Sequence, residues 1–147
     1  MTRMSIMLAI VLTPIVQAQT LNLKPGQYEI VSAMSMAGQP TTMPPRKDRH
    51  CYTAQEVENL AATLSRRDPR GACKVLNSSV AGSKLTFTTE CANPDGTTLM
   101  ISGDVTFKSR ESYHSVVNMK QTAGPPSPFQ SGMTINIDAT RIGECAK

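Results

Sequence analysis

Apolar and polar residues alternate along much of the chain, with the period of two that a half-buried β-strand requires. The clearest example runs from Leu99 to Phe107, where leucine, isoleucine, valine and phenylalanine share one face. Six segments of this kind are bounded by glycine, proline or polar turn residues: 27–36, 73–79, 84–91, 99–107, 113–121 and 133–140. Because each has one apolar face, one face of the resulting sheet should be covered and the other should face water.

One segment has the spacing of an α-helix instead. Thr53 and Glu56 have the sequence of a capping box, and apolar residues then recur at helical spacing until about Arg66. The proline and glycine in residues 68–71 end this helix. The pattern as a whole predicts an α+β fold, in which six antiparallel strands, mostly in a meander, curve around one helix.

Two proline-rich segments, 37–50 and 123–131, show neither period and are predicted to be long loops. Each contains one isolated apolar residue, Met43 in the first and Phe129 in the second. Loops at the mouth of a curved sheet often carry binding residues, so Met43 and Phe129 are candidate contacts for an apolar ligand or a partner. The same side chains could instead fill the ends of the core.

The first 18 residues have the organisation of a secretory signal peptide. Arg3 provides a basic start, residues 4–12 form an apolar run, and residues 16–18 offer the small residues of a cleavage site. The run is shorter than the roughly 20 residues that span a bilayer. We therefore expect a signal peptide at 1–18, one domain at 19–147 without a transmembrane segment, and a periplasmic or secreted location.

The four cysteines should form two disulfides, because an exported protein folds in an oxidising compartment. Cys73 and Cys91 are symmetric about a turn at Gly82, which favours their pairing and leaves Cys51 for Cys145. The alternative pairing is Cys51 with Cys73 and Cys91 with Cys145. A zinc site made of all four cysteines is the other alternative, but the chain lacks the C-x-x-C spacing that is typical of zinc sites. With 4% aromatic residues and no tryptophan the core is modest, so these disulfides should contribute strongly to stability.

The formal net charge of +4 comes partly from two basic clusters, at 46–49 and 66–70. A nucleic-acid site would interleave such clusters with stacking aromatic residues, and only Tyr52 lies near either one. The clusters are better interpreted as solvated charges, and no nucleic-acid partner is expected.

No catalytic motif is present. His50 and His114 are the only candidates for a base at neutral pH, and neither has a nucleophile and an orienting carboxylate close in the sequence. The spacings of lipases, zinc proteases, dinucleotide-binding proteins and P-loop proteins are all missing. We expect a non-catalytic module without a cofactor, which binds an envelope partner or an apolar small molecule. An unrecognised hydrolase is a further alternative.

The methionine residues suggest another possible function, copper binding. Met34, Met36 and Met43, with His50 after them, could form a soft site for Cu(I) in a periplasmic copper-binding protein. The stronger interpretation is packing, because Met34 and Met36 share a strand face with Tyr28 and methionine fills cores that are poor in aromatic residues.

Several short motifs of the chain resemble those of an exported bacterial family. They are Pro25-Gly26-x-Tyr28-Glu29, Met34-x-Met36-x-Gly38, Cys51-x-Thr53, the hairpin cysteines Cys73 and Cys91, and Gly143-x-Cys145. Together they are similar to the family catalogued as domain of unknown function 3617, which usually has tryptophan in place of Tyr28. The resemblance spans nearly all of the mature chain. It implies an envelope location and a β-rich domain stapled by disulfides, and it implies no activity and no catalytic residues.

Overall fold

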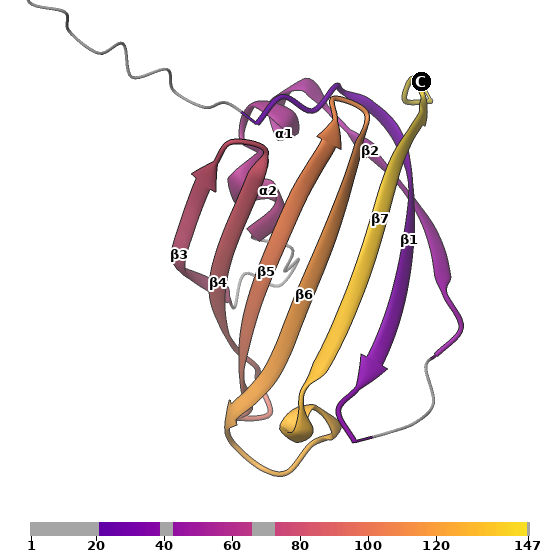
Figure 1. Cartoon of the computed structure of the whole chain (residues 1–147). Coiled ribbons are helices and arrows are strands. Elements are labelled where there is room, and N and C mark those ends of the chain that lie inside the picture. The colour runs from indigo at the N-terminus through magenta and orange to yellow at the C-terminus, as the bar shows by residue number, and fades with distance from the viewer. Residues whose placement is uncertain (1–20, 39–42, 66–72, 147) are drawn as a thin grey trace, which may run out of the picture.

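The computed structural model describes residues 21–38, 43–65 and 73–146. Seven antiparallel strands form one sheet in the order β2-β1-β7-β6-β5-β4-β3 (Figure 1). The strands are β1 (Gly26–Met36), β2 (Arg46–Tyr52), β3 (Cys73–Ala81), β4 (Lys84–Ala92), β5 (Thr98–Ser109), β6 (Ser112–Ala123) and β7 (Met133–Gly143). The helices are α1 (Ala54–Glu58), α2 (Leu60–Ser65) and the short 3-10 helix η1 (Pro128–Ser131).

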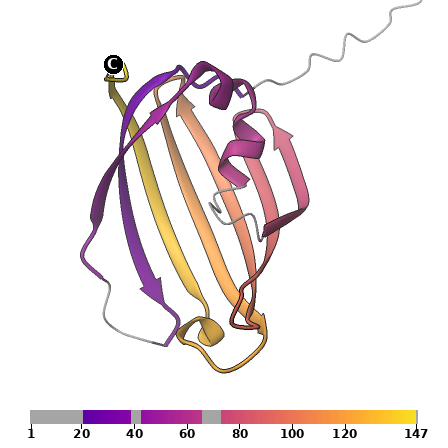
Figure 2. The same ribbon diagram turned by 180° about the vertical axis from the view of Figure 1, so that it is seen from behind.

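The sheet is the predicted meander with one addition at its end. Strands β3 to β7 follow one another in space as they do in the sequence, and β1 then pairs with β7 and with β2. The helices α1 and α2 lie on one face, which we call the inner face (Figure 2). The opposite, outer face carries mainly polar side chains. The predicted class, an antiparallel sheet with helical cover, is thus the observed one.

The prediction of six strands was wrong, because β2 begins in the segment 37–50 that we expected to be a loop. Four charged or polar residues open this strand, from Arg46 to Arg49, and they hide the alternation that identifies the other strands. The strand forms because its backbone pairs with that of β1. The register of this pairing runs from Gly26 opposite Tyr52 to Ser32 opposite Arg46. Charged side chains on such an edge also discourage pairing with another chain.

The prediction of one continuous helix was also wrong. The capping box is present: the Thr53 hydroxyl accepts from the Glu56 amide at 3.2 Å, and the Glu56 carboxylate accepts from the Thr53 amide at 2.8 Å. The bond from the Thr53 amide holds the pKa of Glu56 below its usual value. At Asn59 the backbone leaves helical geometry and the side-chain amide donates to the Gln55 carbonyl, so α1 ends there. The expected helix end at 66–71 lies outside the described residues.

The core lies between the two helices and the nearer half of the inner face. It includes Tyr28, Tyr52, Leu60, Leu85, Val105 and Tyr113. The Tyr28 hydroxyl donates to the Lys24 carbonyl at 2.7 Å, and the Tyr52 and Tyr113 hydroxyls lie 2.8 Å apart. Burial raises the pKa of Tyr28 to about 12. Three tyrosines with bonded hydroxyls therefore supply much of the volume in a core that is otherwise poor in aromatic residues.

Two disulfides join the strands at opposite ends of the sheet. Cys51 in β2 is bonded to Cys145 just after β7, and Cys73 in β3 is bonded to Cys91 in β4. This is the pairing that the symmetry of Cys73 and Cys91 about Gly82 favoured, and it leaves no free cysteine. In the described part of the chain, no helix is long and apolar enough to cross a membrane. The segment of the expected signal peptide lies outside the described residues.

Candidate functional site

The described helices lie over one end of the inner face (Figure 2). Beyond them, the strand register aligns apolar side chains in two rows that cross the sheet: Met34, Ile135, Val117 and Gly103, then Met36, Met133, Met119 and Ile101. We call these two rows the open half of the inner face. All of these side chains are partly exposed, whereas Gly103 is buried. A folded protein normally covers such a surface, so the open half is a candidate binding surface.

A hollow of about 270 Å³ lies where α2 meets the open half. Its walls include Leu64 from α2, Phe87 from β4, Val117 and Met119 from β6, and Ile135 from β7. A smaller hollow of about 30 Å³ adjoins it on the side of the core, since Leu64, Phe87 and Val117 line both. The site is therefore the border between a packed core and an apolar surface that the described residues leave partly exposed.

The polar groups of this hollow already have partners. The Ser65 hydroxyl donates to the Ala61 carbonyl at 2.6 Å, and the Thr89 hydroxyl donates to the Ser65 carbonyl at 3.2 Å. Cys73 and Cys91 are joined as a disulfide. Among the described residues, no buried side-chain nitrogen or oxygen lacks a hydrogen bond. The hollow consequently offers few free polar groups, which suits hydrocarbon better than a charged or sugar-like ligand.

Phe87 lines the hollow and packs against Gly103, and our sequence analysis missed both. The Phe87 ring lies against Gly103, where an added Cβ would meet the ring Cζ at 2.3 Å. A glycine inside an otherwise regular strand is a signal of close approach by another group, so Gly103 could have been noticed. Which group approaches it could not be known, because the pairing of Phe87 with Gly103 depends on the register of β4 and β5.

The predicted binding residues Met43 and Phe129 lie at the same end of the sheet as the open half. Met43 is 43% exposed, and its amide donates to the Met34 carbonyl at 3.3 Å. Phe129 is partly exposed in η1, which directly precedes Met133 and β7. Neither side chain lines the hollow itself. Both stand beside the apolar surface, at its rim.

The structure separates His50 from the methionines of the predicted copper site. His50 is opposite Tyr28 in the register, whereas Met34 lies six residues further along β1, about 20 Å away at the rise of a β-strand. The His50 ring instead lies 4.5 Å from the Tyr52 ring, and its Nε2 is 3.4 Å from a Glu56 oxygen. His50 is thus part of the packing around α1.

The other histidine forms a surface pair on the outer face. His114 Nδ1 lies 2.9 Å from Asp138 Oδ1, and the Lys108 ammonium is 3.4 Å from the same oxygen. The hydrogen bond from His114 holds the pKa of Asp138 below its usual value. In the described ranges, no serine or threonine hydroxyl is hydrogen-bonded to the His114 ring. The pair has the form of an ordinary cross-strand contact, since His114 and Asp138 are opposite in the register.

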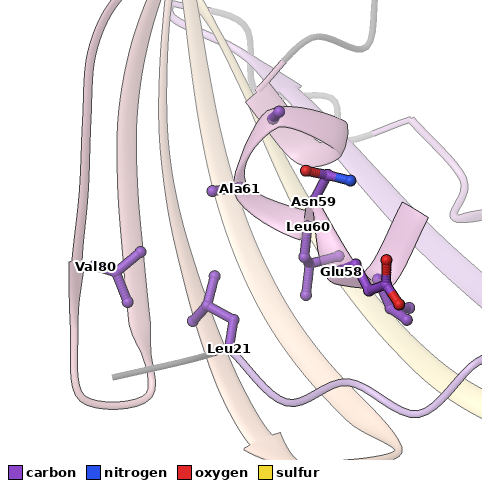
Figure 3. Close-up of a pocket in the computed structure, with 8 residues that line it drawn as sticks. Leu21, Glu58, Asn59, Leu60, Ala61 and Val80 are labelled. Atoms are coloured by element: carbon purple, nitrogen blue, oxygen red, sulfur yellow. The ribbon is translucent and has the colours of Figure 1, made fainter. Parts of the chain in front are cut away.

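A second hollow, of about 330 Å³, lies on the other side of the helices (Figure 3). Leu21 and Val80 face Leu60 and Ala61 across it, while polar Glu58 and Asn59 border it (Figure 3). This hollow shares no lining residue with the inner-face hollow or with the open half. We take the inner-face hollow as the candidate site because it continues into the open half.

A family model described as "Protein of unknown function (DUF3617)" matches residues 23–145. No curated protein and no solved structure matches the chain.

Proposed function

The chain belongs to the DUF3617 family of proteins of unknown function, and we propose that it is a non-catalytic protein that binds an apolar ligand on its inner face. The observation that carries this proposal is the hollow of about 270 Å³ that opens onto partly exposed methionine, isoleucine and valine side chains. Binding sites for small molecules are mostly apolar and concave, with few polar groups.

The size and lining of the site favour a long, flexible apolar chain. At about 270 Å³ the hollow lies just below the usual range for ligand sites, which is roughly 300–1,000 Å³. An acyl chain could place one end beside Phe87 and lie across the open half with the rest of its length. Methionine side chains adapt to such ligands because they are unbranched and polarizable. Met43 and Phe129 would then contact the ligand where it leaves the sheet.

Catalysis is not part of the proposal. The two carboxylate–histidine contacts, His50 with Glu56 and His114 with Asp138, both lie away from the hollow, the first beside α1 and the second on the outer face. The alternative of a hydrolase would require a nucleophile next to one of these pairs.

A ligand-binding test can use two neighbouring valines of β6. Val117 lines the hollow, whereas Val116 points to the outer face, opposite Asp104 and Asn136. We expect Val117→Phe to fill the hollow and to weaken binding of a fluorescent fatty-acid probe by about tenfold or more, which corresponds to about 1.4 kcal/mol. The matched variant Val116→Phe should bind the probe like the parent. Equal binding by both variants, or no binding by the parent, would contradict the proposal.

We also propose that the protein is exported and acts in the bacterial envelope or outside the cell. Two disulfides support this location, because disulfides persist in oxidising compartments. When the chain is expressed in a bacterial host with its own N-terminus, we expect mass spectrometry of the periplasmic fraction to find a mature protein that begins at or near Gln19. A chain that remains in the cytoplasm with Met1 would contradict this expectation.

A further inference from the structure

Three methionines from three adjacent strands form one row across the open half. Met36 in β1 is opposite Met133 in β7, and Met133 is opposite Met119 in β6. Residues directly opposite on antiparallel strands have Cβ atoms roughly 4.5–5.5 Å apart. Because a methionine side chain is flexible over three torsions, the three sulfur atoms can converge above Met133. Met34 lies on the same face, two residues before Met36.

The concentration of methionine here is not a property of the chain as a whole. Six of the nine methionines follow the expected signal peptide. Four of the six are in the open half, and Met43 is bonded through its backbone to Met34. Met100 is the exception: it is opposite Glu90 and Lys120, on the outer face. The row is also partly exposed, so its side chains are accessible in a way that core methionines are not.

We propose that Met36, Met119 and Met133 form a binding site for Cu(I), with Met34 available as a fourth ligand. Thioether sulfur is a soft ligand that selects Cu(I) over the harder divalent ions. The cysteine thiolates that would otherwise compete for the ion are absent, because all four cysteines form disulfides. Arg46 in β2 lies on the inner face as well. Its guanidinium is paired with Asp48 at 2.9 Å, which reduces its repulsion of a cation.

This site differs from the one that the sequence suggested. It keeps Met36, replaces Met43 and His50 by Met119 and Met133, and needs no histidine. The row overlaps the surface proposed for the apolar ligand, because Met119 also lines the hollow, but the metal would be held by sulfur atoms and not by the volume of the hollow.

The chemistry of thioethers predicts a Cu(I) affinity that does not change between about pH 5 and about pH 7. Histidine and cysteine bind metals only after losing a proton, so their affinity falls in acid. A methionine sulfur carries no proton to lose. Cu(I) affinity should therefore be the same at about pH 5 as at about pH 7, a range in which a histidine site would titrate. Cu(II), which prefers nitrogen and oxygen ligands, should not bind at this row.

The test is an anaerobic titration of the oxidised mature protein with Cu(I) in competition with a chromogenic Cu(I) chelator. We expect the parent to take up one Cu(I) per chain at both pH values. Each single variant, Met36→Leu, Met119→Leu or Met133→Leu, should weaken binding by about tenfold, equivalent to about 1.4 kcal/mol. Leucine preserves volume and apolarity and usually costs less than about 1.5 kcal/mol of stability, so the variants should keep the melting temperature close to that of the parent.

Met100→Leu is the matched control, because it removes a thioether from the outer face of the same sheet. It should bind Cu(I) like the parent. The proposal is overturned if the parent does not compete with the chelator, if the row variants bind as the parent does, or if Met100→Leu weakens binding as much as they do. Loss of Cu(I) affinity between about pH 7 and about pH 5 would also overturn it, since that result indicates a titrating ligand.

Discussion

Replacing both Cys51 and Cys145 by alanine should lower the free energy of unfolding by about 4–5 kcal/mol, which would leave the protein close to unfolded at room temperature. The two cysteines are 94 residues apart, so the disulfide closes a loop that contains most of the described domain. In the chain-entropy model, the stabilisation grows with the logarithm of loop length. The bond also fastens the edge strand β2, whose side chains are mostly exposed and contribute little packing of their own.

The second disulfide is an internal control for this prediction. Cys73 and Cys91 are only 18 residues apart, in a hairpin that also has its own backbone hydrogen bonds. The same model gives about 3 kcal/mol for its removal. Urea unfolding of the two double-alanine variants, with the parent beside them, would measure both changes. A larger loss from the Cys73/Cys91 variant than from the Cys51/Cys145 variant would contradict the argument from loop length.

Gly26→Ala should destabilise the protein by about 2–5 kcal/mol, from backbone strain and steric overlap together. Gly26 has φ of 145°, a conformation that side chains other than hydrogen rarely allow. A Cβ at this position would lie 2.5 Å from the Gly143 carbonyl oxygen and 2.5 Å from the Arg141 Nε. Arg141 cannot easily move away, because its Nε donates to the Pro25 carbonyl at 2.9 Å and its side chain is only 10% exposed.

Gly82→Ala separates the two causes. Gly82 has φ of 59° in the turn between β3 and β4, but no atom lies within 4 Å of the place that a Cβ would occupy. This variant should therefore show the backbone cost alone, about 1–2 kcal/mol. Thermal and urea unfolding of both variants would measure the difference. If Gly26→Ala were no more destabilised than Gly82→Ala, the contacts with Arg141 and Gly143 would be unimportant for stability.

The amino-acid sequence by itself determined the strands of the meander and the start of the first helix. Alternation from Leu99 to Phe107 and from Met133 to Thr140 is a local property, and it places one face of each strand against the core whatever its partner is. The capping box of Thr53 and Glu56 is local as well, since its two hydrogen bonds span only three residues. The symmetry of Cys73 and Cys91 about Gly82 favoured the pair that the hairpin contains.

The tertiary structure alone decided what lacks a local signal. Strand β2 forms from a charged segment because β1 lies beside it. The candidate sites depend even more on long-range pairing. Met36, Met119 and Met133 are far apart in the sequence, and only the registers of β1, β6 and β7 align them. A periodic pattern shows which face a residue takes, whereas its neighbour across the sheet is fixed by the register of the whole fold.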